Sequence, residues 1–196
     1  MFQSIFSWVC HQLPDRSPCL DGCYFPVCYR CAGIYFGLAS TVIFLVLLGR
    51  LRSTFPTLTL SLTISFLLLP IGVDGWANTL GLWNSPAWVR YATGVMAGSS
   101  LPMIFFPLCW GVDPDEGGSP RVVRSLGELL AVLFCGSLFL IPLEFEWGLL
   151  LWPLMEPMVT LGLITLVSVA LSCLHLGWRM YRVTSSAASE SVNQEP

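Results

Sequence analysis

Five long apolar runs constrain this chain more than any other feature of its sequence. They extend approximately over residues 32–49, 55–73, 89–108, 126–143 and 158–180. A helix of about 20 mainly apolar residues crosses a membrane hydrocarbon core of roughly 30 Å. Only 11% of the residues are charged, whereas soluble domains carry about 25%. The sequence therefore predicts an all-α integral membrane protein with about five transmembrane helices, a multi-pass protein of the cell membrane.

The remaining segments suggest how the chain is divided. Residues 1–31 are expected to form a Cys-rich extracytoplasmic cap, and residues 32–182 the transmembrane domain. Residues 147–155 are apolar but short and contain Pro153, so we expect an interfacial or re-entrant piece leading into the fifth helix, with a sixth span as the alternative. Residues 183–196 are rich in Ser and Ala, which predicts a disordered cytoplasmic tail.

Arginine placement predicts the orientation, because cytoplasmic loops are enriched in Lys and Arg. The chain contains nine arginines and no lysine. With five helices and an outside N-terminus, six arginines would be cytoplasmic: Arg50, Arg52, Arg121, Arg124, Arg179 and Arg182. Three would be on the outer side: Arg16, Arg30 and Arg90. This split predicts an N-terminus outside and a C-terminus inside. The lipid bilayer is the expected partner, and a net charge of −3 without a basic stripe predicts no nucleic-acid partner.

Five of the eight cysteines fall between positions 10 and 31, directly before the first apolar run. Cys28-Tyr-Arg-Cys31 is a CxxC motif, and its two sulfurs at a helix start can face one metal ion or form one disulfide. The helix N-terminus and Arg30 both favour the thiolate, which is the nucleophile and the metal ligand. Cys10 and His11 add a thiol and an imidazole, so the four residues match the ligand set of a tetrahedral zinc site.

Three interpretations of these cysteines stay open. The favoured one is a site for zinc or a similar metal on the CxxC motif with one or both of Cys10 and His11. The second is a membrane thiol–disulfide oxidoreductase that passes electrons from the CxxC motif to a quinone. The third is a set of structural disulfides in the cap. Cys19 and Cys23 are the best candidates for such a pair, since Asp21-Gly22 between them is typical of a turn.

Polar residues of the second and third apolar runs fall on the same predicted membrane face as the cysteines. Asp74 lies near the outer boundary, where an ionisable group usually faces a cavity or a partner. Arg90 is its nearest candidate partner. The alternative is a loop Asp in a turn with Gly75 and an Arg that extends to the interface. The GxxxG motifs at 33–37 and 94–98 would let the first and third helices pack closely and bring Arg90 beside the CxxC motif.

The sequence Cys10-His-Gln-Leu-Pro-Asp-Arg-Ser17 followed by Cys28-Tyr-Arg-Cys-Ala-Gly-Ile-Tyr-Phe-Gly37 resembles the hallmark of a prokaryotic membrane family, domain of unknown function 2085. The resemblance continues at Asp74-Gly75 and at Arg90-Tyr-Ala-Thr-Gly94, and it covers roughly residues 10–98. The chain departs from the family pattern at Asn78, where Gln is expected, and at Ala87, where Asn is expected.

The resemblance implies a polar pocket beside the cysteines. The family pattern includes His11, Arg16 and Asp74, which a pure dithiol relay would not need, and this favours the metal interpretation. Arg16, Arg30, Asp74 and Arg90 are then candidate pocket or catalytic residues, next to a metal that is either structural or a Lewis acid. A lipid-soluble substrate or a membrane-protein partner is expected, and the sequence leaves open whether the protein is an enzyme.

Overall fold

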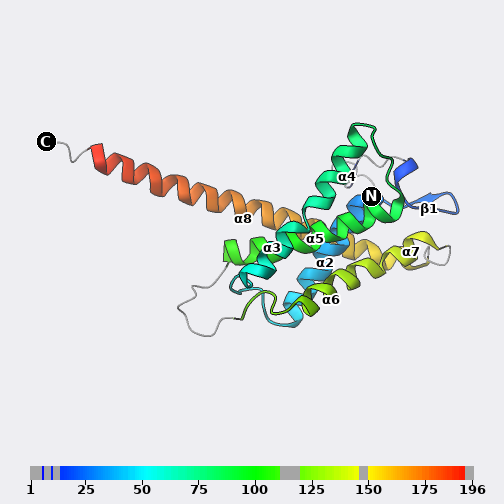
Figure 1. Cartoon of the computed structure of the whole chain (residues 1–196), viewed down its shortest axis with the longest axis horizontal. Helices are drawn as coiled ribbons and strands as arrows, with labels where there is room; N and C mark the ends of the chain where they lie inside the picture. The colour runs from blue at the N-terminus through cyan, green and yellow to red at the C-terminus, as the bar shows by residue number, and fades with distance from the viewer. Residues whose placement is uncertain (1–5, 7–9, 11–13, 111–119, 146–149, 193–196) are drawn as a thin grey trace.

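The computed structural model describes residues 6, 10, 14–110, 120–145 and 150–192, and it is mostly helical (Figure 1). A short 3-10 helix and a two-stranded hairpin come first: η1 (Pro14–Arg16), β1 (Cys19–Leu20) and β2 (Cys23–Tyr24). The helices that follow are α2 (Tyr29–Leu47), α3 (Leu58–Phe66), α4 (Leu69–Thr79), α5 (Ala87–Trp110), α6 (Leu126–Leu138), α7 (Leu140–Glu144) and α8 (Trp152–Val192).

Five segments of the described chain are long and apolar enough to span a membrane. They are Tyr29–Leu47, Leu58–Thr79, Ala87–Cys109, Leu126–Glu144 and Trp152–Trp178. The second segment consists of α3 and α4, and the fourth consists of α6 and α7. The number of spans predicted from the sequence is confirmed. The second span ends later than predicted, at Thr79 rather than near residue 73, so Asp74 belongs to α4 and not to a loop.

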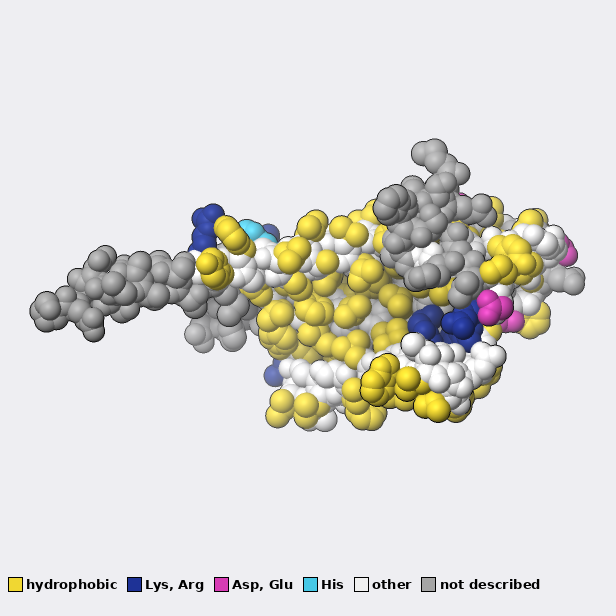
Figure 2. Space-filling model, turned by 90° about the horizontal axis from the view of Figure 1, so that it is seen from above, with side chains coloured by type: hydrophobic (Ala, Val, Ile, Leu, Met, Phe, Trp, Pro, Cys, Tyr) yellow, Lys and Arg dark blue, Asp and Glu magenta, His cyan; other side chains and the backbone are white. Residues whose placement is uncertain are grey.

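The outer surface of the bundle is apolar. Many large hydrophobic side chains of the helices are exposed, among them Leu58, Leu62, Phe66, Val73, Trp76, Leu130, Phe134, Leu154, Ile164 and Leu171. Figure 2 shows such side chains over most of the visible face. An apolar surface of this extent is unfavourable in water and suits the hydrocarbon of a bilayer.

Helices α2 and α5 form the centre of the bundle, where they are the most buried of the five spans. Their backbones approach closely at the two GxxxG motifs. A Cβ added at Gly37 of α2 would lie 2.7 Å from the carbonyl oxygen of Val95, and one added at Gly98 of α5 would lie 2.9 Å from the Cα of Ile34. The absence of side chains at these positions lets the two helices touch, as the motifs predicted.

The segment before α2 packs onto the bundle. Phe6, Phe25 and Val27 are buried in the same apolar cluster as Tyr35 of α2 and Trp152 of α8. The rings of Phe25 and Trp152 meet edge to face, with centroids 5.2 Å apart. These contacts join the expected cap to the transmembrane core. The expected boundary at residue 31 falls inside α2, because this helix already begins at residue 29.

The hairpin within this segment has a two-residue turn. Asp21 and Gly22 both have positive φ, 49° and 76°, a combination that matches the right-handed twist of the flanking strands and favours Asp-Gly. The turn that the sequence predicted here is confirmed. Cys19 pairs with Tyr24 across the hairpin, and Leu20 pairs with Cys23.

Helix α8 is longer at both ends than the sequence indicated. It begins at Trp152, so most of the described part of the segment 147–155 is its first turn rather than a separate interfacial piece. At the other end it continues to Val192, where a disordered tail was expected. The last part contains Ala and Ser but no Gly or Pro that would end a helix. With 41 residues α8 is about 60 Å long, and its C-terminal part projects from the bundle (Figure 1).

Candidate metal centre and adjacent arginine pocket

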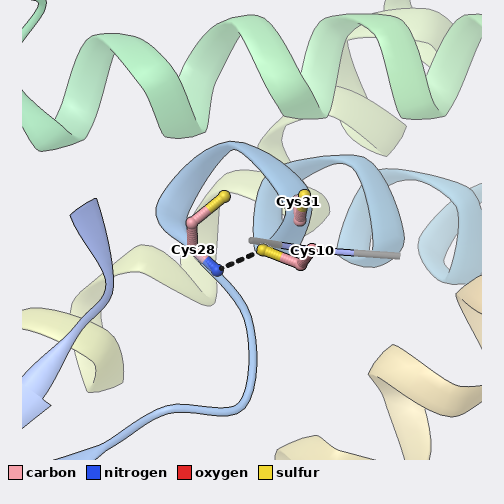
Figure 3. Close-up of side chains that lie close together, drawn as sticks. All are labelled: Cys10, Cys28 and Cys31. Carbon is pink, nitrogen blue, oxygen red and sulfur yellow. Dashed lines mark hydrogen bonds between the residues drawn. The ribbon is translucent and has the colours of Figure 1, made fainter. Parts of the chain in front are cut away.

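Three cysteine side chains meet at the beginning of α2. The sulfur atoms of Cys10, Cys28 and Cys31 all lie within 4.8 Å of one another (Figure 3). Sulfurs on one tetrahedral zinc ion are about 3.8 Å apart, because each Zn–S bond is about 2.3 Å long. Movements of about 1 Å or less would therefore bring the three sulfurs onto one ion.

Helix α2 positions two of these sulfurs. Cys28 is the N-cap residue, with an extended backbone (φ −69°, ψ 162°), and its side chain makes no capping hydrogen bond to the helix. Cys31 lies in the first turn, and residues three apart on a helix face the same side. The CxxC spacing thus directs both side chains to one point, as the sequence predicted.

Cys10 reaches this point from the preceding segment. Its amide N–H donates to the carbonyl oxygen of Phe6 at 2.8 Å, and Phe6 itself is buried in the apolar core. The side chain of Cys10 is only 5% exposed. Its sulfur accepts a hydrogen bond from the amide N–H of Cys28 at 3.3 Å. Hydrogen bonds from outer-shell groups orient metal ligands, and hydrogen bonds to sulfur tune metal–thiolate sites.

The thiol of Cys28 is harder to ionise than a free cysteine. Hydrogen bonding with the Cys10 side chain, and to a lesser extent burial, raises its pKa above the usual value, although hydrogen bonding with Cys31 lowers it. The sequence had suggested that the helix N-terminus and Arg30 would favour the thiolate, and the crowding of three thiols outweighs that effect. A protonated thiol is a weak nucleophile, whereas a coordinated metal ion removes the proton.

The other predicted ligands and cysteines are placed differently. His11 lies outside the described residues. Cys19 and Cys23 are exposed, and both are free thiols. They occupy diagonal positions of the hairpin, and successive side chains of a strand point to opposite faces, so the two thiols face away from each other. The disulfide between them is not formed in this structure and stays a prediction.

An ion pair lies directly beside the cysteines. Arg30, between Cys28 and Cys31 on α2, donates to the Oδ2 carboxylate oxygen of Asp74 on α4. The side chain of Asp74 is well buried, whereas that of Arg30 is partly exposed. The sequence had suggested Arg90 as the partner of Asp74, and this was wrong. The first turn of α2 directs Arg30 toward α4, so the CxxC motif itself supplies the counter-charge.

Arg90 of α5 is held by neutral groups. Its Nη2 donates to Asn84 Oδ1 at 2.8 Å and to Asn78 Oδ1 at 3.2 Å, and its Nε donates to Ser85 Oγ at 3.3 Å. Asn78 also donates to Asp74 Oδ1 at 3.1 Å and to Ser85 Oγ at 2.6 Å. Asn78 therefore connects Arg90 to the ion pair, and all these groups form one network. We call this set, with Arg16, the arginine pocket.

Sequence reasoning missed three members of this network: Asn78, Asn84 and Ser85. Asn78 was noted only because it differs from the residue expected in the family. It lies four residues after Asp74 in a helix, and residues at this spacing face the same side, so a helix extending to Thr79 would have identified it. Asn84 and Ser85 lie in the loop before α5, where no sequence pattern distinguishes them.

Arg16 completes the set of predicted pocket residues. It ends η1, and its Nε lies 3.5 Å from a carboxylate oxygen of Asp15. It is also close enough to Arg90 for the two positive charges to interact. The structure thus brings Arg16, Arg30, Asp74 and Arg90 to the end of the bundle that carries the cysteine cluster.

These features define a class: a polytopic helical membrane protein with a partly buried three-cysteine cluster next to a polar arginine pocket. A model of the family described as "Predicted membrane protein (DUF2085)" matches residues 10–104, which include both sites. The chain belongs to this family, as its motifs indicated. No solved structure matches the chain.

Two archaeal relatives are each similar over about half of the chain. An uncharacterised protein of Methanothermobacter thermautotrophicus is 36% identical over 99 residues, which are 50% of this chain and 86% of the relative. An uncharacterised protein of Methanocaldococcus jannaschii is 32% identical over 105 residues, 54% of this chain and 66% of the relative.

Proposed function

We propose that Cys10, Cys28 and Cys31 bind a thiophilic metal ion, with zinc as the first candidate. The observation that carries this proposal is the convergence of three sulfurs within 4.8 Å of one another, from two separate segments of the chain. Three thiolates suit zinc and similar soft or borderline ions. His11, which follows Cys10 in the sequence, is the candidate for the fourth ligand.

The metal would fasten the N-terminal segment to the end of α2. Cys10 is separated from Cys28 by 18 positions, and its sulfur already accepts a hydrogen bond from the Cys28 amide. A dithiol relay requires only two sulfurs, so the third buried sulfur supports a metal site rather than a relay. If His11 does not coordinate the ion, one coordination position stays open, and the ion would act as a Lewis acid beside the arginine pocket.

This site would lie on the outer face of the membrane. The support is the distribution of arginines: six fall at the cytoplasmic ends of the five spans when the N-terminus is outside, and three fall at the cysteine end. Because cytoplasmic segments are enriched in Arg and Lys, the cysteine end is assigned to the outside and the end of α8 to the cytoplasm.

The test is elemental analysis of the purified full-length protein together with a count of free thiols. We expect one metal ion per chain in the natural protein and a loss of most of it in Cys10→Ser, Cys28→Ser and Cys31→Ser. Each variant should also be less stable, since the free energy of metal binding contributes to folding. Cys135→Ala is the matched control, because Cys135 is exposed on α6 and lies outside the cluster.

A thiol–disulfide relay would give the opposite result. The two thiols of Cys28 and Cys31 would then lose two electrons and two protons and form a disulfide, while a quinone gains both and becomes a quinol. Protein without bound metal, in which quinone removes two free thiols and Cys10→Ser changes nothing, would refute the metal proposal and support the oxidoreductase.

A further inference from the structure

The arginine pocket contains more positive than negative charge. Arg16, Arg30 and Arg90 come from η1, α2 and α5, and both Arg16 and Arg30 are close enough to Arg90 for their charges to act on it. Figure 2 shows Arg side chains gathered in a hollow of the surface, with acidic side chains at its edge. The acidic residues that interact with these arginines are Asp15 and Asp74.

The two acids do not neutralise the three arginines. Asp74 forms an ion pair with Arg30, and Asp15 is an exposed residue directly before Arg16 in the sequence. Arg90 is 7% exposed, and within the described residues its hydrogen-bond acceptors are the neutral groups of Asn78, Asn84 and Ser85. Residues 1–14, of which the structure describes Phe6, Cys10 and Pro14, contain no Asp or Glu.

Hydrogen-bonding capacity is also left over. The Nε atoms of Arg16 and Arg30 are buried and have no hydrogen-bond partner in the described part of the chain. The buried Arg90 has no carboxylate among its described hydrogen-bond acceptors, and burying a guanidinium near the like charges of Arg16 and Arg30 is costly. An anion between these side chains would remove both penalties. The planar guanidinium fork matches the oxygens of a phosphate or carboxylate.

We propose that the arginine pocket binds a phosphate-type oxyanion between Arg16, Arg30 and Arg90. Phosphate is favoured over a carboxylate because it has more oxygens to share among three guanidinium groups that come from three different elements. The pocket also lies at the ends of the spans, at the depth where lipid headgroups are found. The phosphate belongs either to a lipid headgroup or to a free anion. None of the pocket groups is a cluster thiol, so this proposal does not depend on metal binding.

The test uses the purified full chain in an uncharged detergent and two probes. Inorganic phosphate is titrated by calorimetry, and retention of phosphatidic acid is measured by native mass spectrometry against a diacylglycerol with the same acyl chains. We expect at least one phosphate probe to bind and the diacylglycerol not to be retained. Binding of inorganic phosphate by itself identifies a free anion, and retention of phosphatidic acid alone identifies a lipid headgroup.

Two variants and one control locate the binding site. Arg90→Gln and Arg16→Gln should each weaken binding by about tenfold or more, the effect of losing a charge-assisted hydrogen bond. Arg52→Gln, an exposed arginine beyond the other end of α2, should bind like the natural protein. Arg16 is 42% exposed, so Arg16→Gln should fold and keep its metal content even if Arg90→Gln does not fold. The proposal is overturned if neither probe binds, or if Arg16→Gln binds the probe as tightly as Arg52→Gln does.

Discussion

Replacing Gly98 by Ala should loosen the contact between α2 and α5. The added Cβ would lie 2.8 Å from the carbonyl carbon and 2.9 Å from the Cα of Ile34. Both atoms belong to the backbone of α2, so no side chain can rotate away, and the helices must separate by several tenths of an ångström. Overpacking of this kind costs about 3 kcal/mol at the upper end of its usual range. Alanine has a higher helix propensity than glycine, and this difference offsets about 1 kcal/mol of the overpacking cost.

The expected net loss for Gly98→Ala is therefore about 2 kcal/mol, which lowers the melting temperature of a chain of this size by about 4–8 °C. This decrease in melting temperature is measured by thermal unfolding in detergent, with tryptophan fluorescence as the signal. Gly72→Ala is the matched control: Gly72 lies in α4, and an added Cβ there meets nothing within 4 Å. It should leave stability unchanged or raise it by up to about 1 kcal/mol. If Gly98→Ala melts at the same temperature as Gly72→Ala, the close helix contact is not what holds the bundle together.

Two further predictions concern the ion pair and the orientation. Asp74→Asn should destabilise the fold by about 2 kcal/mol. This is somewhat less than the cost of losing one partner from a fully buried pair, because Arg30 is partly exposed. Asp21→Asn, in an exposed turn, is the control, and equal melting temperatures of the two variants would contradict a stabilising role for the pair. A cysteine introduced at Ser186 should react with a membrane-impermeant maleimide only after cells are permeabilised, whereas Cys19 and Cys23 should react in intact cells after mild reduction. Labelling of position 186 from outside would reverse the proposed orientation.

The sequence allowed the spans and their closest contact to be predicted. Hydropathy identified the five segments because each must satisfy its backbone hydrogen bonds within the membrane, and this leaves a strong compositional signal. The two GxxxG motifs identified the pairing of α2 with α5, since only glycine permits backbone contact. The CxxC spacing placed Cys28 and Cys31 on one side of a helix, and the structure confirms that Cys10 joins them.

The polar partners could not be predicted in the same way. Which arginine meets Asp74 depends on the rotation of α2 relative to α4, and no local pattern encodes that rotation. The sequence pointed to Arg90, whereas the tertiary packing brings Arg30 to Asp74. Asn78 was overlooked for a related reason: the predicted span ended before it, whereas α4 continues to residue 79. The ends of helices are set by contacts and caps that single-sequence patterns describe poorly.

The beginning of α2 makes the two sites inseparable. Cys28 and Cys31 direct their sulfurs to one side of the helix start, while Arg30 between them reaches α4 on another side. Each residue added to a helix turns the following ones by about 100°. An insertion or deletion of one residue here would therefore carry one of these side chains out of its own site while disturbing the other. Residues 28–31 therefore serve both sites at once, and neither the cysteine cluster nor the arginine pocket can change its position in the sequence without the other.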